Sequence, residues 1–223
     1  MKVKVQARGF TLIELLVALV IMATLSIMAW RGLDVLVNSR EQAREIDSSV
    51  SGWNAALTQW RLDLDRLDGA AESAAFWLSN SVAPAAVTRV QEGIVLSLRT
   101  SDGMRVVAWG LRPDERGILR WTRWVSAPLL TLQQWRQAID AAAQALTQSS
   151  SDIGGERVQT VAARAMQLEV YGEQGWAAMA PGAQLQQAPH GLRLTLVVEK
   201  DEAVGTGNVV ATWVSPKVRG SAS

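Results

Sequence analysis

The longest apolar stretch of the chain runs from Phe10 to Trp30, and Glu14 is its only ionisable side chain. As an α-helix this stretch would be about 30 Å long, which is enough to cross the hydrocarbon core of a bilayer. A carboxylate at the centre of an inserted helix costs about 2.5–3.5 kcal/mol on insertion scales. The sequence therefore predicts a membrane-spanning helix in which something must neutralise Glu14.

A short basic segment precedes the apolar stretch. Its only charged side chains are those of Lys2, Lys4 and Arg8, and basic flanks stay on the cytoplasmic side of a membrane. An ordinary secretory signal is cleaved after its apolar region, whereas here the small residue Gly9 comes before it. Cleavage between Gly9 and Phe10 would leave the apolar helix in place and would create an α-amino group on Phe10. That amine is a charge partner for Glu14.

The stretch GFTLIELLVALVIM, residues 9–22, resembles the class III signal of type IV pilins and type II secretion pseudopilins. That signal is a short basic leader ending in glycine, followed by Phe-Thr-Leu-x-Glu at the start of an apolar helix. The resemblance implies that an inner-membrane prepilin peptidase and methyltransferase cuts after Gly9 and N-methylates Phe10. It also implies that Glu14 pairs with the Phe10 amine of a neighbouring subunit during assembly, which sets the axial register of the filament.

On the residues alone, two partners for Glu14 remain open. Phe10 and Glu14 lie one turn apart on the same helix, and the helix dipole favours a carboxylate in the first turn. The amine of the same chain is therefore one partner, and the amine of a neighbouring subunit is the other. A plain signal anchor is disfavoured because it would leave Glu14 unpaired in lipid.

Composition agrees with a protein of the cell envelope. The chain has 223 residues, of which 48% are hydrophobic, and this length allows one membrane helix plus a globular domain of about 150 residues. It contains no cysteine, so the fold cannot depend on disulfide bonds. If the three basic leader residues are removed, 19 basic and 21 acidic side chains remain. This balance does not indicate a polyanion-binding protein.

An apolar stripe continues beyond the membrane segment. Its residues recur at steps of three and four, which predicts one face of an amphipathic helix: Ala43, Ile46, Val50, Trp53, Leu57, Trp60, Leu64 and Leu67. No proline precedes Pro84, so a single helix from Phe10 to Leu67 is expected. A coiled coil could use the same stripe, but two tryptophans favour packing on a broad sheet over a narrow helical seam.

Beyond Asp68-Gly69 the periodicity changes to that of short strands separated by turns. Strands are predicted at Ile94–Leu98, Met104–Trp109, Ile118–Val125, Met166–Tyr171, Leu192–Glu199 and Val209–Val214. A second helix is predicted from Thr131 to about Thr147, and Gln148 to Glu156 is expected to form an exposed loop. The predicted fold is α+β, with a long N-terminal helix laid on antiparallel sheet, which is the plan that pilins and pseudopilins share.

These elements divide the chain into five predicted segments. Residues 1–9 form the leader peptide, 10–30 the transmembrane and filament-core helix, 31–68 its periplasmic amphipathic continuation, 69–216 a β-rich globular domain, and 217–223 a flexible tail. The basic leader predicts a single pass through the inner membrane, with the C-terminal domain in the periplasm.

Residues suited to catalysis or metal binding are sparse. The one histidine, His190, lies in Gln187-Ala188-Pro189-His190-Gly191, which is typical of a solvated turn before a strand. With no cysteine either, we expect no catalytic site, no cofactor and no metal site. The acidic groups, Asp63 with Asp65 and Glu199 with Asp201 and Glu202, lack the spacing of a calcium-binding loop and are interpreted as solvated charge.

Arginine and tryptophan alternate in one predicted strand, a composition that can hold single-stranded nucleic acid. The residues are Arg116, Arg120, Trp121, Arg123 and Trp124. Strand alternation sends Trp121 and Trp124 to opposite faces of a sheet, which suits packing on both sides better than one stacking platform. Nucleic acid is therefore not an expected partner.

Residues 30–68 resemble one particular type of protein within this family. The segments AWRGLDVLVNSREQAREI and LTQWRLDLDRLD resemble the J-type minor pseudopilin of type II secretion, whereas the K-type typically lacks the glutamate that Glu14 provides. The J-type resemblance implies a structural subunit, not an enzyme, that joins the I- and K-type minor pseudopilins in the tip complex of a pseudopilus. Its other partners would be the major pseudopilin, inner-membrane lipid and the inner-membrane assembly platform. The alternative is a minor pilin of a type IV pilus, acting in pilus assembly, adhesion or DNA uptake.

Overall fold

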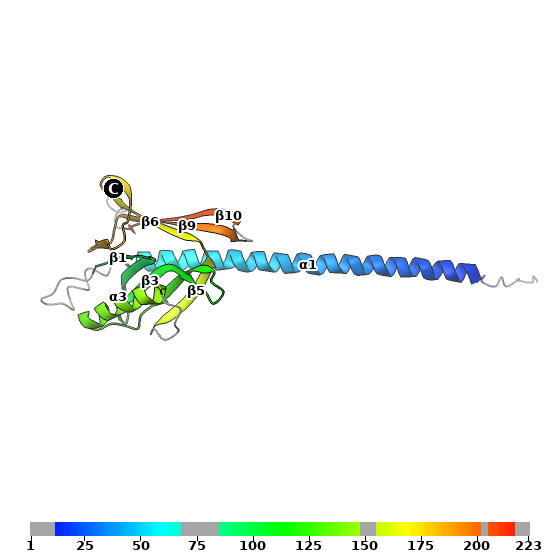
Figure 1. Ribbon diagram of the computed structural model, residues 1–223, viewed down its shortest axis with the longest axis horizontal. Coiled ribbons are helices and arrows are strands. Elements are labelled where there is room, and N and C mark those ends of the chain that lie inside the picture. The colour runs from blue at the N-terminus through cyan, green and yellow to red at the C-terminus, as the bar shows by residue number, and fades with distance from the viewer. Residues whose placement is uncertain (1–11, 68–84, 148–154, 202–204, 217–223) are drawn as a thin grey trace, which may run out of the picture. The chain divides into compact units, whose positions relative to one another are not determined.

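The chain forms two compact units in a computed structural model, Met1–Asp47 and Ser48–Ser223. The structure describes residues 12–67, 85–147, 155–201 and 205–216 (Figure 1). The leader residues 1–9, Phe10, the Asp68-Gly69 boundary and the tail 217–223 therefore lie outside the described residues.

Helix α1 spans Leu12–Asp65 and contains 54 residues. Proline, which would break a helix, is absent from this segment, and the glycines Gly32 and Gly52 do not interrupt it. The predicted single helix is confirmed over these residues. The second helix, α3, spans Leu132–Thr147. Thr131 caps its start, because its hydroxyl oxygen accepts a hydrogen bond from the Gln134 backbone amide at 3.2 Å.

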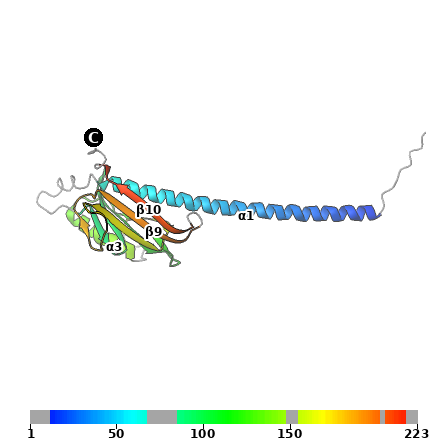
Figure 2. The same cartoon turned by 90° about the horizontal axis from the view of Figure 1, so that it is seen from above.

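In the described part of the second unit, ten strands form two antiparallel sheets. The six-stranded sheet has the order β5-β4-β3-β2-β1-β8, with β1 at Val87–Val90, β2 at Gly93–Thr100, β3 at Gly103–Pro113, β4 at Leu119–Val125, β5 at Glu156–Ala162 and β8 at Gln184–Leu185. The four-stranded sheet has the order β10-β9-β6-β7, with β6 at Ala165–Gly172, β7 at Gly175–Ala178, β9 at Gly191–Asp201 and β10 at Gly205–Val214. Figure 2 shows β9 and β10 running side by side.

The end of α1 lies between the two sheets, and α3 covers the far face of the six-stranded sheet (Figure 1). The core between the sheets contains Trp53, Trp60 and Leu64 of α1 together with residues of both sheets, among them Trp109, Trp121, Leu194 and Trp213. Trp60 makes edge contacts with Trp109 and Trp121, each with ring centroids 5.8 Å apart. A second core joins α3 to the opposite face through Val106, Trp124, Ala142 and Leu146. The preference for a sheet over a coiled coil is confirmed for this part of the stripe.

The predicted α+β fold is confirmed: the strands predicted from the sequence are all present, and the antiparallel strands form two sheets. β1, β5, β7 and β8 were not predicted, and Glu156, assigned to a loop, is the first residue of β5. Of the apolar stripe, Trp53, Trp60, Leu64 and Leu67 are buried, whereas Val50 is 40% exposed. The side chains of Ala43 and Ile46 lie outside the described residues.

The interpretation of Asp63 as solvated charge is wrong. Its side chain is completely buried, and its oxygens accept hydrogen bonds from Arg123 Nε at 2.7 Å, Arg123 Nη2 at 2.8 Å, Trp109 Nε1 at 2.8 Å and Gln59 Nε2 at 3.0 Å. These donors are what permits a carboxylate in the core, because an unpaired buried charge is strongly unfavourable. Asp65 is exposed, but it also takes part in a hydrogen bond: its Oδ1 accepts from Trp213 Nε1 at 2.7 Å.

Replacing Trp53 and Trp60 together by alanine should nearly abolish the stability of the domain. Truncating a buried tryptophan opens a cavity and costs about 3–5 kcal/mol, which for two sites is comparable to the whole free energy of unfolding of a domain. Urea unfolding of the fragment from Arg40 to Ser223 would measure the loss. Leu62→Ala is the control on the same helix because Leu62 is 46% exposed. A double variant that unfolds at the wild-type urea concentration would mean that the stripe does not stabilise its own domain.

Asp63→Asn should lower the free energy of unfolding by about 3 kcal/mol, because it keeps the shape of the side chain but leaves Arg123 without its countercharge. Breaking a buried ion pair costs about 3–5 kcal/mol of stability. We expect the lower end of this range because 14% of the Arg123 side chain is exposed. Asp140→Asn, at an exposed position of α3, is the matched control. A loss of less than about 1 kcal/mol, the range of surface pairs, would contradict a structural role for the ion pair.

Candidate functional site

Glu14 lies in the first turn of α1. This is the end of a helix at which the aligned peptide dipoles stabilise a carboxylate. Gly9 and Phe10 lie outside the described residues, so the cleavage site, the methylated residue and the pairing of Glu14 with the Phe10 amine stay predictions. The structure does describe the exposed helix surface that surrounds Glu14.

That surface is largely apolar, with Glu14 and Arg31 as its only charged residues. Residues Leu12–Leu33 have a mean hydropathy of 2.5, none of them is buried, and by length and composition they could cross a membrane. The hydroxyl groups within this stretch bond inside the helix: Thr24 Oγ1 donates to the Ile21 carbonyl and Ser26 Oγ to the Met22 carbonyl, both at 2.8 Å. Such internal bonds satisfy polar groups where water is absent. A helix surface of this kind supports membrane anchoring.

The two tryptophans of β4 are buried on opposite faces of the six-stranded sheet. Trp121 is buried in the core on the α1 side of the sheet and Trp124 in the core on the α3 side, so the prediction that they face opposite ways is confirmed. Arg123 is paired with Asp63 at 2.7 Å and Arg120 with Asp114 at 2.9 Å. Arg120 also lowers the pKa of Asp114. Neither indole ring is accessible for stacking on a base.

The remaining residues singled out from the sequence are not brought together. His190 is exposed directly before β9, as predicted for a solvated turn, and its carbonyl accepts a hydrogen bond from the Ser215 amide at 2.9 Å. The side chains of Glu199 and Asp201, and all of Glu202, lie outside the described residues. Within the described part of the chain, no group of three or more His, Asp or Glu residues is placed to hold a metal ion.

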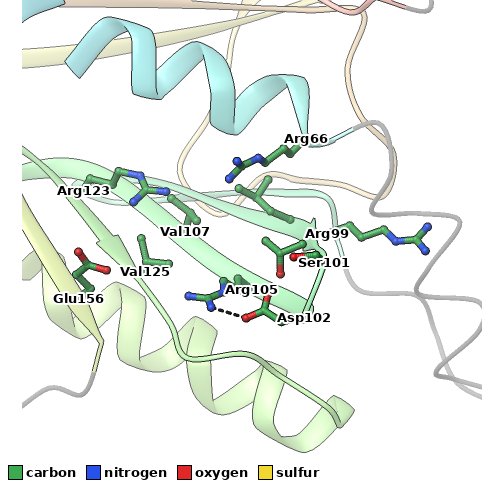
Figure 3. A pocket seen from close by; sticks show the side chains of 11 residues that line it. Arg66, Arg99, Ser101, Asp102, Arg105, Val107, Arg123, Val125 and Glu156 are labelled. Atoms are coloured by element: carbon green, nitrogen blue, oxygen red, sulfur yellow. Dashed lines mark hydrogen bonds and ion pairs between the residues drawn. The ribbon is translucent and has the colours of Figure 1, made fainter. Parts of the chain in front are cut away.

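A hollow of about 770 Å³ lies at the end of the second unit where α1 meets the turn between β2 and β3. Its charged and polar lining consists of Arg66, Arg99, Thr100, Ser101, Asp102, Arg105, Arg123 and Glu156, and all of these except Thr100 are labelled in Figure 3. Arg105 donates to Asp102 at 2.6 Å. This hydrogen bond, together with one from the Thr100 side chain, lowers the pKa of the Asp102 carboxyl to about 2. The sequence did not predict this hollow, because its lining comes from positions far apart in the chain.

Comparison with known proteins bears on the N-terminal segment. The family model of the prokaryotic N-terminal methylation motif matches residues 5–30, the stretch that contains Gly9, Phe10 and Glu14. A search of curated proteins finds no match to the chain. The motif implies processing by a prepilin peptidase. Together with an apolar N-terminal helix and an α+β fold, it supports a type IV pilin-like protein that is anchored in a membrane.

Proposed function

We propose that this chain is a J-type minor pseudopilin of a type II secretion system. In this role it is a structural subunit of the pseudopilus tip complex, where it initiates assembly and helps to export folded proteins. The observation that carries the proposal is the methylation motif at residues 5–30, set on a helix whose stretch Leu12–Leu33 is long and apolar enough to cross a membrane. A pilin-like motif also favours a structural role over an enzymatic one.

The J-type assignment rests on the segment that ends α1. The resemblance covers residues 30–68, and the apolar stripe in this segment is what joins the helix to the domain through Trp53, Trp60 and Leu64. The proposed partners are the I- and K-type minor pseudopilins, the major pseudopilin and the inner-membrane assembly platform. A minor pilin of a type IV pilus is the alternative proposal, because pilins and pseudopilins share the N-terminal motif.

The proposed topology follows from the same segments. Residues 1–9 are removed as a leader, residues 10–30 remain in the inner membrane, and residues 31–216 lie in the periplasm, with 217–223 as a tail. Lys2, Lys4 and Arg8 support this orientation, since basic residues flanking a span are retained in the cytoplasm. Glu14 then lies within the span, close to its cytoplasmic end.

Gly9→Val should block removal of the leader, because the peptidase requires a small residue before Phe10. Intact-mass analysis of the protein extracted from membranes should show the whole chain for the variant and a chain beginning with methylated Phe10 for the wild type. Gly32→Val is the matched control, since a Cβ added at this position of α1 meets no other part of the described structure within 4 Å. A wild-type protein that begins at Met1 in cells containing the peptidase would refute the proposed processing.

Glu14→Val should abolish assembly while leaving membrane insertion and cleavage intact. The substitution removes the cost of placing a carboxylate in lipid, and it leaves the junction at Gly9 unchanged. Apolar helices in lipid have no hydrophobic force to align them. Without the Glu14 charge, neighbouring subunits should therefore lose their axial register. Glu14→Gln, which keeps hydrogen bonding without the charge, should be intermediate. Thr24→Val is the control on the same exposed surface.

Each variant is expressed in a strain that lacks the wild-type gene. Leader cleavage, cross-linking to the other minor subunits, secretion and piliation are then measured. Loss of secretion alone supports the pseudopilin, and loss of piliation alone supports the minor pilin. Normal assembly of Glu14→Val would show that Glu14 does not set the register, and failed cleavage would assign Glu14 to recognition by the peptidase.

A further inference from the structure

Strand β10 is the outermost described strand of the four-stranded sheet, whose order is β10-β9-β6-β7. The other described strands at the ends of the two sheets are short or charged: β7 has four residues, β8 has two, and β5 begins with Glu156 and Arg157. Short length, charge and proline are features that keep an edge strand from pairing with another chain. β10 has ten residues, GTGNVVATWV, and none of them is charged or proline. Its shift of register lies between Gly205 and Gly207, so the run from Asn208 onward is regular.

The direction of the backbone groups of β10 follows from one hydrogen bond. The Ser215 amide donates to the His190 carbonyl at 2.9 Å, one position beyond the pair of Val214 with Gly191. Hydrogen-bonded and non-hydrogen-bonded pairs alternate along an antiparallel ladder. Val214 and every second residue before it are therefore not hydrogen-bonded to β9. The N–H and C=O groups of these residues point to the edge of the sheet: Asn208, Val210, Thr212 and Val214.

The four residues that point to the edge are all exposed, and Val210 and Val214 are 55% and 38% exposed. The residues between them face the core, where Trp213 is buried and Val209 and Ala211 are partly buried. The core is thus only partly covered at β10. A strand added here would bond to the edge-facing residues, and its alternate side chains would extend the core beside Val209 and Ala211.

We propose that β10 binds an extended, uncharged segment of another protein, which adds to the four-stranded sheet as a fifth strand. An edge of N–H and C=O groups recognises extended backbone, and side chains at alternate positions give selectivity. A charged side chain in the added strand would lie beside a strand that has no charge to pair with it. Valine and threonine suit such a pleated, half-buried surface. The proposed place of the protein in secretion is not needed for this pairing.

A second copy of this chain matches the edge less well than a different protein does. Two β10 strands paired antiparallel about Ala211 would place Asn208 of each opposite Val214 of the other, and asparagine is disfavoured in strands. Pairing about Thr212 avoids Asn208 but uses only the edge-facing residues from Val210 to Val214. A different protein can place a favourable residue opposite all of the edge-facing positions.

The test measures binding of the labelled peptide Ac-Thr-Val-Thr-Val-Thr-Val-Thr-Gly-Lys-Lys-amide to the full chain in micelles of a non-ionic detergent. The lysines keep the peptide soluble and lie beyond its pairing segment. Fluorescence anisotropy should give a Kd of about 0.1–1 mM, the range of weak sites. The same peptide with its Thr-Val segment fully N-methylated is the control. It should not bind, because it cannot donate hydrogen bonds to the edge.

Two proline variants test the direction of the backbone groups. Thr212→Pro removes an N–H that points to the edge, so the chain should melt close to the wild-type temperature but bind the peptide about fivefold more weakly. Ala211→Pro removes an N–H that bonds to β9, where Ala211 lies opposite Leu194, so it should lower the melting temperature markedly. Thr212→Val keeps the N–H and should change the Kd less than about twofold. Circular dichroism gives the melting temperatures.

Four outcomes would overturn the proposal. The first two are no binding of the peptide at millimolar concentration and equal binding of its N-methylated form. The third is a melting temperature lowered as much by Thr212→Pro as by Ala211→Pro, which would show that the edge is already paired within the chain. The fourth is a wild-type dimer in light scattering that Thr212→Pro makes monomeric, which would identify a second copy as the occupant. None of these measurements involves leader cleavage or secretion, so they are distinguishable from failure of the proposed function.

Discussion

Two carboxylates at the end of α1 connect the helix to both sheets. Asp63 accepts hydrogen bonds from Arg123 and Trp109 of the six-stranded sheet, and Asp65 accepts one from Trp213 of the four-stranded sheet. Residues two apart on an α-helix point to nearly opposite sides, so one helical turn can bond a sheet on either side. The rest of the domain depends on this turn, because the helix is the layer that separates the two sheets.

The tryptophans explain how a charge can be tolerated at that turn. Trp109 and Trp213 contribute large apolar surfaces to the core, and each also directs its indole N–H to a carboxylate. Burial of Asp63 would otherwise cost several kcal/mol. Its four donors, two of them from a guanidinium group, offset that cost and fix the rotation of α1 about its axis. A purely apolar stripe could pack at several rotations, whereas this carboxylate fits only one.

Local patterns in the sequence were sufficient to predict α1, α3 and the strands β2, β3, β4, β6, β9 and β10. Steps of three and four residues identified the buried face of α1, and alternation placed Trp121 and Trp124 on opposite faces of β4. The burial of Asp63 could not be predicted in this way, because its partner Arg123 is 60 residues away and a charged residue beside a stripe is usually solvated. The division into two sheets and the lining of the hollow likewise depend on contacts between distant segments. The processing motif could be recognised because its residues are adjacent in sequence.

Glu14 and Asp63 show two ways in which one helix can carry a carboxylate among apolar residues. The partners of Asp63 belong to its own chain, so its charge is compensated when the domain folds. The proposed partner of Glu14 is an amine that leader cleavage creates, so this pairing could form only after processing. A carboxylate in lipid is costly, and two apolar helices have no hydrophobic force of their own to bring them into register. Pairing Glu14 with a neighbour's amine would lower that cost only in the correctly aligned complex, which links processing to assembly.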